Sequence, residues 1–161
     1  MSSIQLANHL RQVTTGGNWS ASHLKQHLQA TTLEEAKSKI GSLNTILALS
    51  YHILYYVRAI TPVMRGGSLD AHDKYSYDSP EISSEQEWEA MKESIYSEIE
   101  SLAQLIEVYP SDKLSDSFEL EKYGSYHRNL LGLIEHTHYH LGQIAIIKKL
   151  LRDASTDTTA I

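Results

Sequence analysis

The sequence predicts an all-α protein, a four-helix bundle, and three observations lead to this expectation. Long segments carry apolar residues at steps of three and four, which is the period of an amphipathic helix. No stretch of useful length shows the apolar–polar alternation of a β-strand. Glycine pairs or a proline stand at the ends of three of these segments. Four such helices, with long connections between the first and second and between the second and third, predict a bundle.

The first helix is expected over residues 3–14, and a glycine pair at residues 16–17 ends it. Its apolar positions are Ile4, Leu6, Leu10 and Val13. Residues 18–40 are expected to be irregular, with two short turns of helix. Ser22 is predicted to cap the first turn, over residues 23–28, and Thr32 to cap the second, over residues 33–40, in a capping box with Glu35.

The second long helix is expected over residues 42–64, before a glycine pair at residues 66–67. Its stripe comprises Thr45, Leu49, His52, Tyr56, Ala59 and Val63. The following segment, residues 65–83, is too long for a tight helical hairpin. We expect it to run along the bundle and to shield the end that carries the candidate site described below.

The third helix is expected over residues 85–109, with a capping box of Ser84 and Glu87 and with Pro110 after its end. Its inward stripe comprises Trp88, Met91, Ile95, Ile99, Leu102 and Ile106. The fourth helix is expected over residues 125–152, with a stripe of Leu133, His136, His140, Ile144, Ile147 and Leu151. Residues 1–152 then form one domain, and residues 153–161 form a polar, frayed tail.

Composition excludes several classes of function. The 161 residues suit a single domain, and 14 basic against 20 acidic side chains give a net charge of −6. That balance argues against a nucleic-acid partner. The absence of cysteine excludes disulfides, thiolate nucleophiles and iron–sulfur clusters. No signal peptide or membrane-length apolar run is visible, so we expect a cytoplasmic protein with no membrane partner.

Three of the nine histidines lie on the predicted core stripes: His52, His136 and His140. The last two are four residues apart on one helix face, a spacing at which two imidazoles can bind one metal ion. His52 lies near the middle of the second helix, and the pair lies near the middle of the fourth. The three rings can therefore meet at one level inside the bundle. Three histidines with an open position are typical of a catalytic site, and zinc, nickel, iron, cobalt and manganese all remain possible. The alternative to a metal site is that these histidines are ordinary core residues, each satisfied by hydrogen bonds. His138 is expected to point away from the pair.

Other metal and catalytic motifs are absent. A di-iron bundle needs two Glu-x-x-His motifs, and the one such pair here, Glu135 with His138, lies off the core stripe. No His-Glu-x-x-His, Gly-x-Ser-x-Gly, P-loop or dinucleotide-binding motif is present.

Two stretches carry a resemblance to a known family. Residues 132–144, GLIEHTHYHLGQI, contain a His-x-x-x-His-x-Gly-Gln pattern, and residues 49–56, LSYHILYY, place a histidine in the second helix. Both resemble motifs of the DinB/YfiT-like superfamily, as do Trp19 and the segment after it. The resemblance covers nearly the whole chain, and its specific part lies in the fourth helix.

The resemblance implies a four-helix bundle, a divalent metal on His52, His136 and His140, and a homodimer. Zinc or nickel is expected first, with iron, cobalt or manganese as alternatives. Some relatives are metal-dependent transferases or isomerases that use low-molecular-weight thiols. Many members carry arginine where Leu141 stands, so the substrate contacts of those relatives are not carried over.

The functional expectation is a metal-dependent enzyme that acts on an unidentified small molecule, as a thiol-dependent transferase or as a hydrolase. The alternative is a non-catalytic, metal-stabilised bundle with a stress-response or interaction role. Tyr56, one turn from His52, is expected to line the pocket and to donate a hydrogen bond. Gln143 is expected to support the ring of His140, and Gly142 to allow a close approach between helices.

Overall fold

The computed structural model describes residues 1–158, with side chains through residue 154, and this part of the chain is all-α. It has no β-strand, only an isolated bridge between Ser117 and Ser125. Its α-helices are α1 (Ser3–Thr15), α2 (Leu24–Gln29), α3 (Leu33–Lys37), α4 (Ile46–Met64), α5 (Glu85–Val108) and α6 (Tyr126–Thr158). Short 3₁₀ helices are η1 (Asp73–Tyr75), η2 (Ser111–Ser115) and η3 (Glu121–Tyr123).

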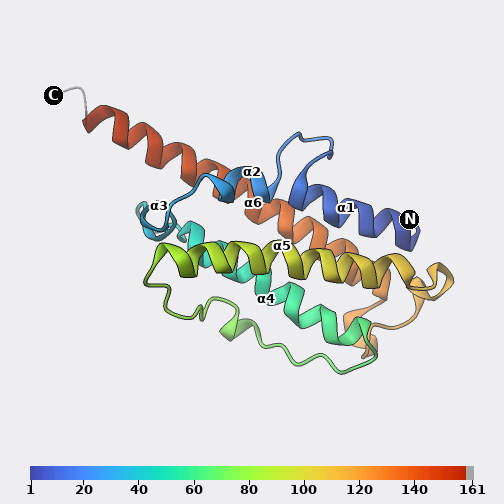
Figure 1. Ribbon diagram of the computed structural model, residues 1–161. Helices are drawn as coiled ribbons and strands as arrows, with labels where there is room; N and C mark the ends of the chain where they lie inside the picture. The colour runs from blue at the N-terminus through green and yellow to red at the C-terminus, as the bar shows by residue number, and fades with distance from the viewer. Residues whose placement is uncertain (159–161) are drawn as a thin grey trace.

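The four long helices, α1, α4, α5 and α6, pack around one core (Figure 1). Helix α5 contacts α1 and α4, and helix α6 contacts the same two helices. Helices α4 and α5 run in the same direction, so residues 65–84 must return along the length of α4 before α5 begins (Figure 1). The expected crossover along the helices is therefore confirmed.

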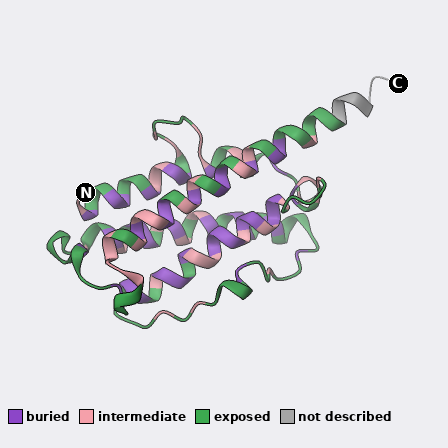
Figure 2. Cartoon of the chain, turned by 180° about the vertical axis from the view of Figure 1, so that it is seen from behind, coloured by how far each residue is buried: buried purple, intermediate pink, exposed green. Residues whose placement is uncertain are grey.

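The core lies between the inner faces of these helices, where buried residues gather (Figure 2). All six predicted stripe residues of α5 are buried, and Trp88 is fully enclosed. Its indole Nε1 donates a hydrogen bond of 2.8 Å to the carbonyl oxygen of Thr31, which fixes the loop between α2 and α3 on α5. The helical periodicity thus identified the core face of α5 correctly.

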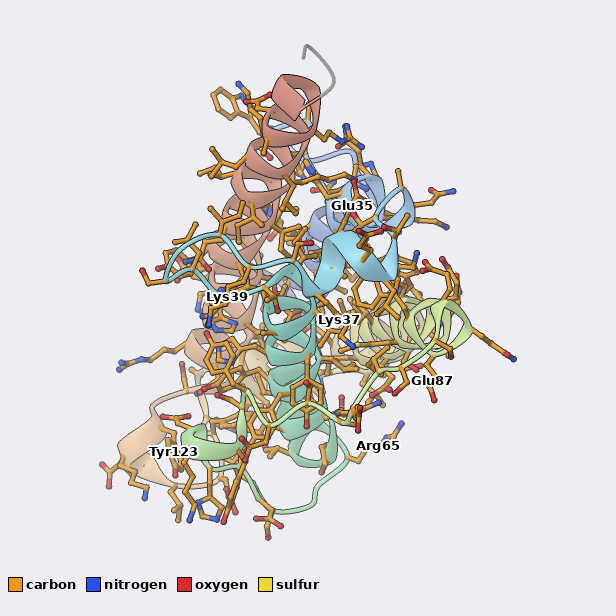
Figure 3. All side chains as sticks on the ribbon, turned by 90° about the vertical axis from the view of Figure 1, so that its left-hand side faces the viewer. Glu35, Lys37, Lys39, Arg65, Glu87 and Tyr123 are labelled. Atoms are coloured by element: carbon orange, nitrogen blue, oxygen red, sulfur yellow. The ribbon has the colours of Figure 1, made fainter. Side chains whose placement is uncertain are left out.

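The capping boxes at Thr32 with Glu35 and at Ser84 with Glu87 are confirmed, and Figure 3 labels both glutamates. The predicted Ser22 cap is wrong. The ring of His23 takes the N-cap position of α2, where Nδ1 accepts from the backbone N–H of Gln26 at 3.2 Å.

Three other expected boundaries differ. Helix α4 begins at Ile46, because the hydroxyl of Thr45 caps it by accepting from the N–H of Ala48 at 3.1 Å. Helix α3 ends at Lys37 rather than at residue 40. Helix α6 continues beyond Arg152 to Thr158, over a segment without glycine or proline, so residues 153–158 are not a frayed tail. Residues 159–161 of that predicted tail lie outside the described residues.

The role expected for Gly142 is also wrong. A Cβ atom added there would meet nothing within 4 Å, so no helix approaches this glycine closely. The position is exposed on α6.

Among the described residues, α4 is the one helix that is long and apolar enough to cross a membrane. More than half of it is buried against the other helices. Its packing against α3, α5 and α6 accounts for its apolar composition.

Trp88→Phe is expected to destabilise the protein by about 1–3 kcal/mol, because it removes the indole donor and leaves the Thr31 carbonyl with only Lys92 Nζ at 3.5 Å. Chemical denaturation followed by circular dichroism measures the change. Trp19→Phe is the matched control, since Trp19 is fully exposed and its replacement should change stability by less than about 0.5 kcal/mol. Equal effects of the two substitutions would contradict this account of the core.

Candidate metal centre

Helices α4 and α6 bring three histidine rings together. His52 comes from the middle of α4, and His136 and His140 come from one face of α6. The Nε2 atom of His136 lies 3.1 Å from Nε2 of His52 and 2.9 Å from Nε2 of His140. One nitrogen from each ring falls in a group whose members all lie within 4.8 Å of one another. The predicted convergence of the three rings is confirmed.

Two of the rings are held from behind by oxygen acceptors. Nδ1 of His52 lies 3.3 Å from the carbonyl oxygen of Ser76, and Nδ1 of His140 lies 2.7 Å from Oε1 of Gln143. A carbonyl oxygen only accepts, so each Nδ1 carries the proton. This arrangement directs the Nε2 lone pair of each ring inward, as the hydrogen bond behind a metal-bound histidine does. The supporting role expected for Gln143 is confirmed.

The three inward-facing Nε2 atoms carry too few protons to form hydrogen bonds across both of their close contacts. With Nδ1 protonated, neutral His52 and His140 both present a lone pair at Nε2. His136 can place one proton on its own Nε2, and that proton can point to only one neighbour. Nδ1 of His136 is buried and has no hydrogen-bond partner among the residues that the structure describes. A divalent cation would accept all three lone pairs, and two nitrogens bound to one ion at about 2.0–2.1 Å lie about 3 Å apart.

Burial keeps these rings neutral. It lowers the pKa of His136 to about 4, with smaller contributions from the charges of His140 and His52. Burial also lowers the pKa of His52 and of His140 below the ordinary histidine value. Neutral imidazole is the form that binds a metal. The three side chains therefore fit a divalent ion, and no ion identity follows from them alone.

The connection between α4 and α5 closes one side of the cluster. The ring of Tyr77 stacks on His52 with centroids 4.0 Å apart and planes 11° apart. Tyr55 donates to the carbonyl oxygen of His72 at 2.9 Å, and Tyr56 donates to Oδ1 of Asp73 at 2.8 Å. This connection therefore shields the cluster, as expected from the sequence.

A cavity of about 360 Å³ reaches His136 from another side. It is lined by Tyr56, Ile60, Arg128, Asn129, Gly132, Leu133 and His136. Tyr56 also borders a neighbouring cavity of about 510 Å³, which Lys74 of η1 and Tyr123 of η3 help to line; Figure 3 labels Tyr123. Burial, followed by the hydrogen bond to Asp73, raises the pKa of Tyr56 to about 12, so its phenol stays protonated. The expected position of Tyr56 beside a cavity is confirmed, and its hydroxyl proton is used within the chain by Asp73.

The structure separates the other candidates from this centre. His138 is half-buried elsewhere on α6, and its pKa is lowered by burial and by the nearby His9. Glu135 is exposed. The sequence reasoning missed the individual contacts of Ser76, Tyr77 and Asp73. These residues lie in an irregular connection, where no periodicity indicates which side chain or carbonyl faces the helices.

Comparisons of the chain with protein-family models, with curated proteins and with solved structures found no match.

His140→Ala is expected to abolish metal binding and the stabilisation that bound metal gives, because it removes one of three converging nitrogens. His138→Ala is the matched control and should retain both. Elemental analysis and thermal denaturation, each with and without chelator, measure the two effects. Wild-type metal content in the His140→Ala variant would contradict the assignment of the centre.

The metal-free protein is expected to lose stability as the pH falls from about 6.5 towards 4. The pKa of His136 is lower in the folded chain than in the unfolded chain, so the unfolded state binds more protons over this range. Stability is therefore fully present above about pH 6.5 and declines below it. Urea denaturation across this range measures the slope, and His136→Gln should reduce it. An unchanged slope in that variant would assign the acid sensitivity to other groups.

Proposed function

We propose that this chain is a divalent-metal-binding protein of the DinB/YfiT-like type, and that its four long helices form the corresponding four-helix bundle. The observation that carries the proposal is the convergence of three Nε2 atoms with too few protons among them. The resemblance of the second-helix and fourth-helix motifs points to the same three residues. Zinc or nickel is the ion proposed first, and iron, cobalt or manganese are alternatives.

We further propose that the centre is catalytic and acts on a small molecule. Three protein ligands leave positions free on the ion, which is typical of catalytic rather than closed structural sites. The cavity beside His136 supports this proposal, because it offers a route by which a small molecule reaches the histidine cluster. A bound divalent ion would supply Lewis-acid chemistry, which polarises an electrophile or lowers the pKa of water or of a thiol.

The side chains around the centre support binding and orientation rather than proton abstraction. The phenol of Tyr56 stays protonated at neutral pH, since its pKa is about 12, and its O–H donates to Asp73, which holds the ring edge-on to His136 at 4.8 Å between centroids. Transfer of a low-molecular-weight thiol to a reactive small molecule is the reaction we propose first, on the resemblance alone. Hydrolysis is the second reaction.

A non-catalytic bundle, in which the ion mainly holds α4 and α6 together, is the competing function. The hydrogen bonds behind His52 and His140 favour this structural role, because they make the centre rigid. The cavity at His136 favours the enzyme, because a purely structural ion gains nothing from access to the surface.

We also propose a cytoplasmic homodimer. Exposed apolar side chains on α6 support the dimer: Tyr139, Ile146 and Leu150 follow one another at steps of seven and four residues. This spacing places them along one side of the helix, as in helix–helix interfaces.

The proposed function is tested by loading the full chain with cobalt(II) and adding 2-mercaptoethanol. We expect about one ion per chain and a changed visible absorption spectrum on addition of the thiol, since the ion has free positions. The metal-loaded protein should then accelerate the reaction of the thiol with chlorodinitrobenzene, in which sulfur displaces chloride from the ring and the thiol proton is released to the buffer. His52→Ala should lose all three properties, and His138→Ala should keep them. Bound cobalt with a spectrum that thiol does not change would favour the non-catalytic alternative.

A further inference from the structure

One face of α6 links the histidine cluster to an arginine at the far end of the cavity. Arg128, Gly132, His136 and His140 follow one another at steps of four residues, so each residue neighbours the next on the helix surface. The first three line the cavity beside the cluster. Arg128 and His136 are eight residues apart, which corresponds to about 12 Å along the helix axis.

Gly132 leaves the middle of this face open. A Cβ atom added at Gly132 would meet nothing within 4 Å, so packing does not require a glycine there. Its backbone is ordinary helix, so conformation does not require it either. Glycine inside a helix costs about 1 kcal/mol relative to alanine. What the missing side chain provides is space within the cavity, between Arg128 and His136.

Arg128 supplies a positive charge at the N-terminal end of this space, with its side chain lying over Gly124. Its guanidinium has no carboxylate partner among the described residues, whereas Arg11 and Arg58 are held by glutamates at 2.6–3.0 Å. Asp73, the acidic residue that borders the neighbouring cavity, is engaged by the hydroxyl of Tyr56. The amide nitrogen of Asn129 is also occupied, because it donates to the carbonyl oxygens of Tyr123 and Ser125.

We propose that the cavity binds an elongated small carboxylate, with its carboxylate on Arg128, its apolar middle over Gly132 and its reactive end at the histidine cluster. This inference rests on the proposed metal-dependent function and names the substrate class. Ile60 and Leu133 provide apolar walls for the middle of such a molecule. A single guanidinium matches the single charge and planar shape of a carboxylate, whereas a phosphate dianion calls for additional cations.

The test compares two matched probe series on the cobalt-loaded full chain: straight-chain mercaptocarboxylates from mercaptopropionate to mercaptooctanoate, and the mercaptoalcohols of the same lengths. Dissociation constants come from the visible absorption of cobalt and from calorimetry. At the best length we expect the carboxylate to bind roughly five- to tenfold more tightly than the alcohol, because Arg128 is partly solvated. Arg128→Gln should reduce this ratio to about one and leave the affinity for the alcohol unchanged.

Gly132→Leu tests whether the part of the cavity left open by Gly132 is needed for binding. The leucine side chain should occupy the cavity and weaken binding of both probes by about tenfold or more, while cobalt content and thermal stability are retained. Gly142→Leu is the matched control, since it makes the same change at an open position of α6 outside the cavity and should leave both affinities unchanged.

Two results would overturn the inference: equal affinities for carboxylate and alcohol at every length, or a preference that survives in Arg128→Gln. In either case, if the chain still binds cobalt and its visible absorption spectrum still changes on addition of thiol, the proposed metal-dependent function is not contradicted. Failure of the wild-type chain to bind cobalt would remove the proposed function and this inference together.

Discussion

The mutual approach of three imidazole lone pairs is the constraint on which the rest of this structure depends. Nε2 of His136 lies about 3 Å from Nε2 of both His52 and His140, and the outer hydrogen bonds of those two rings leave His136 as the only source of a proton for the two contacts. One proton can bridge only one of these contacts, whereas a single cation would engage all three nitrogens. Because the rings come from α4 and α6, the same cation would stabilise the packing of these two helices.

The direction of the helices explains why the connection between α4 and α5 takes part in the centre. Two neighbouring helices that run the same way need a connection as long as the helices themselves. That connection passes over the outer side of α4, where Tyr55 and Tyr56 bind its backbone and Asp73. It also supplies the Ser76 carbonyl and the Tyr77 ring that orient and cover His52. A topological requirement thus provides one wall of the site.

The sequence predicted those parts of the site that depend on helical spacing. His136, His140 and Gln143 could be placed on one face of one helix because three- and four-residue steps define a face. His52 could be placed with them because its stripe faced the same core. Contacts from the connection could not be predicted, because an irregular segment has no period. The role given to Gly142 was wrong because a glycine in a motif says nothing about which side of the helix faces a neighbour.

The distinction between a catalytic and a structural ion depends on what surrounds His136. His52 and His140 each have an oxygen behind the ring, while Nδ1 of His136 has no partner in the described part of the chain and its ring borders the cavity. The cluster is therefore asymmetric: two of its rings are held by hydrogen bonds, and the third faces the space lined by Gly132. A structural ion would be served best by three equally supported ligands and a closed wall. An open side at one ring, continued along α6 to an arginine without a carboxylate partner among the described residues, supports the proposed catalytic role over the structural one.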